Sequence, residues 1–189
     1  MSAQESKLFV ISGPSGAGKG TLVTRVRERR SNLGLTVSAT TRAPRKGEVD
    51  GVNYFFLTRE EFDRRVANGE FVEWAEVHGN CYGTLVSEVT SKLASGSSLI
   101  LEIDVQGALQ VKERFPEAVL IFIKPPSLEV LRERLVGRGT ETPETIELRM
   151  ANAADELALA DRYDDVVVND DLDRATDELV RVLDMHERI

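Results

Sequence analysis

The sequence predicts an α/β fold with a three-layer core around a mainly parallel sheet. Four short apolar runs, at residues 7–12, 98–105, 118–125 and 165–170, are continuous rather than alternating and are rich in Val, Ile and Leu. That composition is typical of strands buried on both faces of a parallel sheet. Amphipathic helical patterns separate the runs, and this alternation favours right-handed strand–helix–strand crossovers.

The first run leads directly into the glycine-rich stretch GPSGAGKGT, residues 13–21, and then into the helical stretch LVTRVRERR. Gly13, Gly18 and Lys19 meet the frame G-x-x-x-x-G-K with a strand before it and a helix after it. Small residues let backbone N–H groups turn inward around an anion, and the helix N-terminus adds its positive dipole end. The stretch therefore predicts a phosphate-binding loop, with Lys19 on the β- and γ-phosphates of a nucleotide. The alternative is a glycine-rich turn without a ligand.

The middle of the chain, about residues 36–93, predicts an antiparallel insertion into this core. The stretch EVDGVNYFFL contains an Asp50-Gly51 pair between β-favouring residues, which indicates a hairpin. Thr58 and Glu61 have the spacing of a capping box that opens a short helix, with Phe62 and Val66 facing inward. EFVEWAEVHGNCYGT then returns to strand-like composition.

The C-terminal half contains three further helical patterns. Leucines at 128, 131 and 135 follow a Ser127 cap, and Thr142 and Pro143 open the next helix. The apolar stripe of that second helix consists of Ile146, Met150, Ala153, Leu157 and Ala160. The stripe of the last helix consists of Leu172, Ala175, Leu179, Val182 and Leu183.

Composition limits the possible partners. The 189 residues carry a net charge of −8, which argues against a nucleic-acid partner, because nucleic-acid binding depends on neutralising many phosphates. Cys81 is the only cysteine, so an intrachain disulfide is impossible. No apolar run approaches the roughly 20 residues that span a bilayer. These features predict a cytoplasmic protein that binds neither nucleic acid nor membrane.

A short basic segment stands out in this acidic chain. Arg42, Arg45 and Lys46 lie within five positions of TTRAPRKGEVDGVNY. Arginine's planar fork suits bidentate binding of phosphate, and Tyr54 and Tyr82 offer hydroxyls for its remaining oxygens. The segment predicts a second anion site, for a small ligand, with a plain solvated surface as the alternative.

The loop departs from the common phosphate-loop ending, because Gly20 stands where a metal-ligating Ser or Thr usually follows the lysine. The hydroxyl comes one place later, at Thr21. Asp104, at the end of the run LILEID, is a candidate carboxylate near the metal. Thr21 and Asp104 therefore predict a Mg²⁺ ion held largely through water, although Asp104 could equally be a solvated strand-end residue.

Several successive segments resemble the signature segments of guanylate kinases. They are SATTRAPRKGEVDGVNYFF, EFVEWAEVHGNCYGT, ILEIDVQG and GRGTETPETIELR, and they occur in order over nearly the whole chain. The resemblance implies transfer of phosphate from ATP to GMP, giving ADP and GDP, with Mg²⁺. It also implies a single domain over residues 1–189, with a core at about residues 1–35, 94–137 and 160–189, a GMP-binding insertion at about 36–93 and a lid at about 138–159.

The resemblance also implies roles for individual residues. The GMP phosphate is expected on Arg42, Arg45, Tyr54 and Tyr82. Guanine is expected on Ser38, Glu73 and Thr84, with Asp104 assisting. The ATP site is expected to comprise Gly13, Pro14, Ser15, Gly16, Ala17, Gly18, Lys19, Gly20, Thr21, Arg134 and Asn169. The catalytic charge is expected from Lys19, Arg42, Arg138 and Arg149, the last two on the lid. Ala39 lacks the hydroxyl that the family often has there.

Two alternatives to this activity stay open at the level of sequence. Guanylate-kinase-like domains also occur as non-catalytic binding modules, for which a degraded phosphate loop and companion domains are expected. A kinase of the same architecture could act on another phosphorylated acceptor, with changes expected at Glu73 or Ser38. A phosphate acceptor is largely dianionic at neutral pH and needs no general base, so neither His78 nor His186 is expected to be catalytic.

Overall fold

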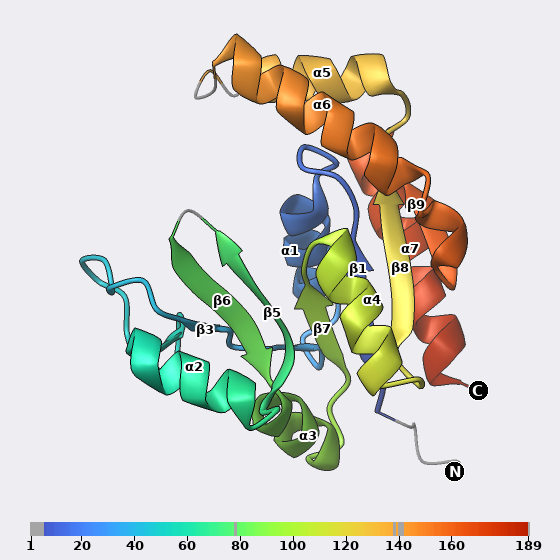
Figure 1. The fold of residues 1–189 in the computed structure, drawn as a ribbon. Coiled ribbons are helices and arrows are strands. Elements are labelled where there is room, and N and C mark those ends of the chain that lie inside the picture. Colours follow the sequence, from blue (N-terminus) through green and yellow to red (C-terminus); the bar gives the residue numbers. More distant parts are fainter. Residues whose placement is uncertain (1–5, 78, 138, 140–141, 189) are drawn as a thin grey trace.

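The computed structural model describes residues 6–77, 79–137, 139 and 142–188. Its larger sheet is wholly parallel, in the order β2–β7–β1–β8–β9 (Figure 1). The strands are β1 Leu8–Ser12, β2 Gly34–Leu35, β7 Leu99–Glu102, β8 Val119–Lys124 and β9 Asp165–Val168. The four apolar runs of the sequence supply four of these strands, which confirms the predicted parallel core.

Helices cover both faces of this sheet, because its central strands bury side chains on both sides. From β1, Phe9 and Ile11 pack into one apolar cluster, while Leu8 and Val10 pack into another. The first cluster is completed by α1 (Lys19–Arg29) and α7 (Leu172–Glu187). The second is completed by α3 (Val86–Ala94) and α4 (Val105–Arg114). Each such large side chain, fully buried, contributes about 1.5–3 kcal/mol to folding.

The inserted middle segment forms a second, smaller sheet in the order β4–β3–β6–β5. Its strands are β3 Ala39–Thr40, β4 Phe55–Phe56, β5 Phe71–Val77 and β6 Asn80–Leu85. The β5–β6 and β3–β6 pairs are antiparallel, as predicted for the insertion, whereas β3 and β4 pair in parallel. In Figure 1 this sheet lies beside the parallel sheet, with α4 between the two.

The hairpin predicted at Asp50-Gly51 is wrong. The pair does form a turn, in which Gly51 has a φ of 74° and its amide donates to the Tyr54 carbonyl at 2.8 Å. The flanking residues do not pair as antiparallel strands, and β4 pairs instead with the distant strand β3. Val49 and Val52 are 55% and 66% exposed. With no sheet face to cover them, their β-propensity has no packing partner to act on.

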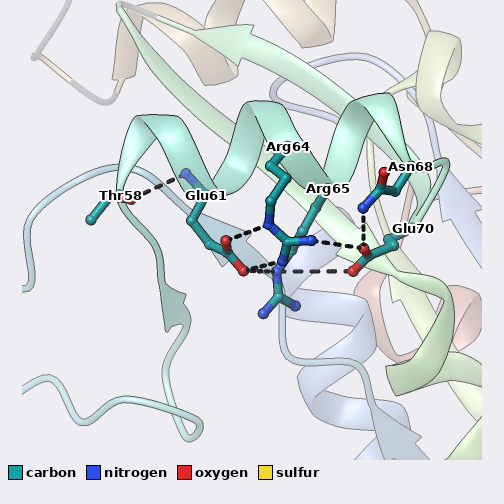
Figure 2. Close-up of polar contacts among 6 residues, drawn as sticks. All are labelled: Thr58, Glu61, Arg64, Arg65, Asn68 and Glu70. Carbon is teal, nitrogen blue, oxygen red and sulfur yellow. Dashed lines mark hydrogen bonds and ion pairs between the residues drawn. The ribbon is translucent and has the colours of Figure 1, made fainter.

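Helix α2 (Arg59–Ala67) begins as the sequence predicted, with the Thr58 hydroxyl accepting from the Glu61 amide at 3.1 Å. Glu61 does not complete a reciprocal capping box. Its carboxylate instead accepts from Arg64 Nε at 2.8 Å and Arg65 Nε at 2.7 Å (Figure 2). These hydrogen bonds lower the pKa of Glu61 to about 2. The cluster lies on the solvent side of the helix, where such ion pairs contribute little to stability.

Helices α5 (Leu128–Gly137) and α6 (Pro143–Leu157) pack against each other above the loop that follows β1 (Figure 1). The predicted stripe of α6 extends one residue too far, because the helix ends at Leu157 and Ala160 lies in the short 3-10 helix η1 (Ala160–Arg162). The chain turns there so that Tyr163 can pack against Phe122 before β9. No helix in the described ranges is long and apolar enough to cross a membrane.

Candidate active site

The glycine-rich loop between β1 and α1 has a backbone that only glycine adopts easily. Gly13, Gly16 and Gly18 have φ values of 142°, 90° and 91°. A Cβ on Gly13 would lie 2.3 Å from the Ile123 carbonyl oxygen, and one on Gly18 would lie 2.4 Å from Asn169 Nδ2. The loop therefore packs closely against its neighbours. Its three glycines are required by the backbone conformation and by this close packing, as well as by the phosphate-loop motif.

Lys19 is the first residue of α1 and folds back over this loop. Its ammonium donates to the carbonyl oxygens of Gly13, at 2.5 Å, and Pro14, at 3.2 Å. Its charge also acts on two carboxyls. Burial raises the pKa of Glu102 and of Glu156, and the positive charge of Lys19 partly offsets both shifts. Lys19 thus lies at the centre of the C-terminal edge of the parallel sheet, where an anion would meet the N-terminus of α1.

Two of the predicted ATP-site residues hold the loop from the side. Asn169 is 5% exposed, and its Nδ2 donates to the Ala17 carbonyl at 2.8 Å. Arg134 Nη2 donates to the Asn169 carbonyl at 2.8 Å. Both residues border an open pocket of about 390 Å³, together with Gly16, Gly18, Thr21, Asp170 and Leu172. The pocket therefore adjoins the loop on the side of Asn169.

Helix α6 reaches the loop through Arg149, whose Nη1 donates to the Ser15 hydroxyl. A residue of the predicted lid therefore contacts the predicted ATP site. Arg138, the other lid arginine, lies outside the described residues, as does His78. His186 Nε2 and Asp165 Oδ2 are hydrogen-bonded at 2.6 Å, and this contact joins α7 to β9.

The predicted anion cluster is assembled around Arg42. Its guanidinium carbon lies 5.4 Å from the ring centre of Tyr54, and the Tyr54 and Tyr82 rings are 6.2 Å apart in an edge-on arrangement. Tyr82 enters from β6, so a side chain distant in sequence completes the cluster. Arg45 lies on the same loop and is exposed.

Glu48, which the sequence analysis missed, organises this cluster. Its Oε1 accepts from Arg42 Nη2 at 2.8 Å and its Oε2 accepts from the Arg45 amide at 2.6 Å. The hydrogen bond with Glu48 raises the pKa of Arg42, and the same bond, with the Arg45 amide, lowers the pKa of Glu48. Both oxygens of one carboxylate thus fix the loop that carries both arginines. Glu48 lies three residues after Arg45, a spacing that could have indicated it.

Two of the predicted base-reading residues face each other across the β5–β6 pair of the small sheet. Glu73 on β5 is directly opposite Thr84 on β6, and Glu73 is only 8% exposed. Burial raises the pKa of Glu73 to about 7; hydrogen bonding from Thr84 lowers it and the charge of Asp104 raises it further. Thr84 Oγ1 is fully buried but makes no hydrogen bond of ordinary geometry within the described part of the chain. Ser38, half-buried, precedes β3.

Asp104 has a structural role as the N-cap of α4, where its Oδ1 accepts from the Gly107 amide at 2.7 Å. The side chain nevertheless lies near both halves of the site, because a Cβ on Gly107 would lie 3.3 Å from both Asp104 Oδ1 and Glu73 Oε2, and the amide of the preceding residue donates to the Ile11 carbonyl of β1 at 3.2 Å. Its negative charge raises the pKa of Glu73 and of Glu156. Lys19 acts on Glu156 in turn. The group formed by the Glu73 carboxyl with Thr84 and Asp104 around it, called the carboxyl pocket below, therefore adjoins the strand that leads into the phosphate loop.

Glu102 is a second carboxylate that the sequence analysis missed. It is the last residue of β7; the residue as a whole is exposed, but its carboxyl lies beside the start of α1, where a Cβ on Gly20 would be 3.5 Å from its Oε1 and where partial desolvation raises its pKa. The sequence could have indicated Glu102, because it is the one acidic residue in the otherwise apolar strand β7. Among the described residues, no group of three or more His, Cys, Asp or Glu side chains is arranged to hold a metal ion by itself. Thr21 lines the pocket beside the loop, and Asp104 caps α4.

Comparison with known proteins supports one family. The family model described as guanylate kinase matches residues 5–186. The chain is 57% identical to a guanylate kinase of Gloeobacter violaceus over 94% of this chain and 87% of the relative. It is 52% identical to that of Halalkalibacterium halodurans over 97% and 90% of the two chains.

A solved structure agrees with these relatives. The crystal structure of guanylate kinase from Anaplasma phagocytophilum superposes with a TM-score of 0.74 at 36% identity, covering 97% of this chain and 87% of the other. The matches extend over both sheets and the paired helices α5 and α6. The chain belongs to the guanylate kinase family.

Proposed function

We propose that this protein catalyses ATP + GMP → ADP + GDP, a reaction of purine nucleotide metabolism. The observation that carries the proposal is the buried carboxyl of Glu73 beside a phosphate-binding loop. The two adjoin through Asp104, whose charge acts on Glu73 and on the Glu156 carboxyl near Lys19. One nucleotide on the loop and one in the carboxyl pocket would face each other across this edge of the sheet.

Guanine suits the carboxyl pocket because its Watson–Crick edge presents N1–H and an exocyclic amine as adjacent donors. An ionised Glu73 is acceptor-only and can accept from both donors at once. The buried Thr84 hydroxyl and the half-buried Ser38 hydroxyl can donate to O6. Adenine would place an unprotonated N1 against the carboxylate and leave a buried charge unpaired.

The GMP phosphate is assigned to Arg42, Arg45, Tyr54 and Tyr82. Arg42 is held by Glu48 at 2.8 Å and lies over the Tyr54 ring, so its planar fork is oriented before the ligand binds. Orienting the guanidinium in advance reduces the entropy lost when the phosphate binds. Glu48 thus positions two binding groups through a single carboxylate.

Transfer itself requires positive charge and alignment more than proton transfer, because the acceptor is a phosphate that is largely dianionic at neutral pH. Lys19 would stabilise the β- and γ-phosphates of ATP, with Arg149 and Arg138 approaching from the lid. Arg134 and Asn169 support the loop from the side that faces the base. Enclosure by α6 would exclude water from the transferring group.

A Mg²⁺ ion bound with ATP would neutralise charge on the phosphate oxygens. The residues present fit a water-mediated ion, since the Thr21 hydroxyl and the Glu102 carboxylate both lie beside the start of α1 and magnesium prefers oxygen ligands with several waters retained. Asp104 offers a further carboxylate nearby. We place the enzyme in the cytoplasm, whose reducing conditions suit the buried free thiol of Cys81.

We also propose that the chain is a single domain with three parts: a core of about residues 1–35, 94–137 and 160–189, a GMP-binding insertion of about 36–93 and a mobile lid of about 138–159. Arg149 on α6 already contacts Ser15 of the loop. We expect amide hydrogen exchange in α6 to slow when a bisubstrate analogue is added, because closure would bring this helix onto the bound phosphates. Mass spectrometry before and after addition measures it, with peptides of β8 as an internal reference. Equal protection of α6 in both states would contradict a closing lid.

The raised pKa of Glu73 predicts a pH-dependent affinity for GMP. The free enzyme loses the acceptor-only form of Glu73 as the pH falls below about 7, and a neutral carboxyl would direct its O–H at guanine's donors. We expect the KM for GMP to rise about tenfold between about pH 8 and about pH 6. The GMP phosphate also titrates near pH 6, so Glu73→Gln serves as the control that keeps only that titration. An identical pH profile in both enzymes would contradict the assignment.

A coupled assay of ADP release across GMP, AMP, CMP and UMP, with ATP as donor, tests the activity. We expect rapid turnover with GMP and weak turnover with the other three. Binding of GMP without turnover would instead indicate a non-catalytic binding module. Preference for another monophosphate would assign the pocket to a different base.

A further inference from the structure

The strand that carries Glu73 begins irregularly. In a regular strand successive side chains alternate between faces, and Phe71 and Val72 do so, since Phe71 packs into the cluster of the small sheet and Val72 packs against α4. Glu73 breaks the alternation, because its carboxylate also faces α4, where a Cβ on Gly107 would lie 3.3 Å from its Oε2. The β5–β6 register shifts between Phe71 and Glu73. Such a bulge turns the strand locally and redirects the side chains that follow it. It is this irregularity that lets Glu73 point into the carboxyl pocket.

Arg114, the last residue of α4, binds the backbone at this irregularity. Its Nη1 donates to the Phe71 carbonyl at 2.9 Å, and its Nη2 donates to the Gly69 carbonyl. A bulge interrupts the ladder, and the polar backbone groups around it need partners from elsewhere. The rigid fork of one guanidinium can hold two such carbonyls in a fixed relative position, which a lysine ammonium cannot do as well.

The other end of α4 contacts the Glu73 side chain itself. A Cβ placed on Gly107 would lie 3.3 Å from Glu73 Oε2, so the absence of a side chain there leaves room for the carboxylate. Asp104, one turn earlier, caps the helix and acts electrostatically on Glu73. Helix α4 therefore contacts Glu73 in two ways. Gly107 lies beside its carboxylate, and Arg114 holds the β5 backbone just before it.

We propose that Arg114 is a positioning residue for GMP: it holds the bulge at the start of β5 and so fixes the direction in which Glu73 meets the base. The inference rests on the proposed role of Glu73 in reading guanine. Arg114 is exposed to solvent on its outer side, so its loss should cost modest stability. Misplacement of the carboxylate should affect recognition more strongly, because small displacements of binding groups are costly.

The test compares Arg114→Met with Lys112→Met. Lys112 lies on the same helix and donates to the Ala118 carbonyl at 2.7 Å and to Asp164 Oδ2 at 3.1 Å, so it contacts the residues that precede β8 and β9 rather than β5. Both variants lose one cation and keep an apolar stem. We expect Arg114→Met to raise the KM for GMP about tenfold with the KM for ATP unchanged, and Lys112→Met to change neither. Arg114→Lys should recover part of the loss.

A second readout separates positioning from general loosening of the fold. Inosine monophosphate keeps N1–H and O6 but lacks the exocyclic amine, so the ratio of kcat/KM for GMP to that for inosine monophosphate reports how well Glu73 is aimed. We expect this ratio to fall in Arg114→Met and to fall less in Arg114→Lys. The Lys variant also provides the test if the Met variant folds poorly. An unchanged ratio, or equal increases in the KM for GMP and for ATP, would overturn the inference. Glu73→Gln is measured alongside. If it also leaves the KM for GMP unchanged, the proposed role of Glu73 in reading the base fails as well. If only the Arg114 variants leave the KM for GMP unchanged, the failure is confined to the role of Arg114.

Discussion

Replacing Lys19 with Ala is expected to lower kcat by about 10²–10³-fold or more while the fold persists. Lys19 is the first residue of α1, and its ammonium is held over the loop by the carbonyls of Gly13 and Pro14. On the bound nucleotide it would stabilise negative charge on the β- and γ-phosphates as the bond to the γ-phosphate breaks. Removing a charge that acts in the transition state should reduce kcat more than it raises the KM for GMP.

A suitable control is Arg25→Ala on the same helix. Arg25 forms an exposed ion pair with Asp173 at 2.6 Å, a class of interaction that contributes little to stability. Steady-state kinetics and thermal unfolding of both variants should show a large loss of turnover for Lys19→Ala alone. A folded Lys19→Ala variant with nearly normal kcat would mean that the ammonium does not act on the transferring phosphate.

Replacing Glu73 with Gln is expected to raise the KM for GMP about 10²-fold and to leave the KM for ATP nearly unchanged. Glu73 is only 8% exposed, so water cannot readily replace a lost acceptor there. A neutral amide keeps the shape of the side chain but places an N–H₂ donor against one of guanine's two donors. The buried mismatch should therefore weaken GMP binding rather than the fold.

Glu76→Gln is the matched control for this variant. Glu76 lies on the same strand, but it is exposed and pairs with Arg59 at 3.0 Å. Initial-rate kinetics with GMP and ATP varied separately would distinguish the two substrates. If Glu73→Gln had an unchanged KM for GMP, or if Glu76→Gln weakened GMP equally, Glu73 would not be the base-reading residue.

The parts of the site that are continuous in the chain were predictable from sequence. The phosphate loop depends on spacing within nine residues, and the parallel strands could be recognised because burial on both faces demands unbroken apolar runs. The caps at Thr58 and Thr142 likewise depend on neighbours three residues away. For such features the local sequence contains the information that the structure uses.

Features that depend on distant contacts were not predictable in this way. Val49 and Val52 had the composition of a strand, but the sheet offered them no partner, and β4 paired with β3 instead. Arg114 donates to carbonyls that lie 43 and 45 positions earlier in the chain, and backbone carbonyls have no sequence signature. The aim of Glu73 likewise depends on a bulge that breaks the alternation used to predict which side chains are buried.

The most direct test of the central claim, that a buried carboxylate selects guanine, is to compare GMP with inosine monophosphate in the wild-type enzyme and in Glu73→Gln. The two acceptors differ only in the exocyclic amine that Glu73 is proposed to bind. We expect the wild-type kcat/KM to favour GMP by about 10- to 100-fold, and the Gln variant to lose most of that preference. Equal preference for GMP in both enzymes would contradict the account.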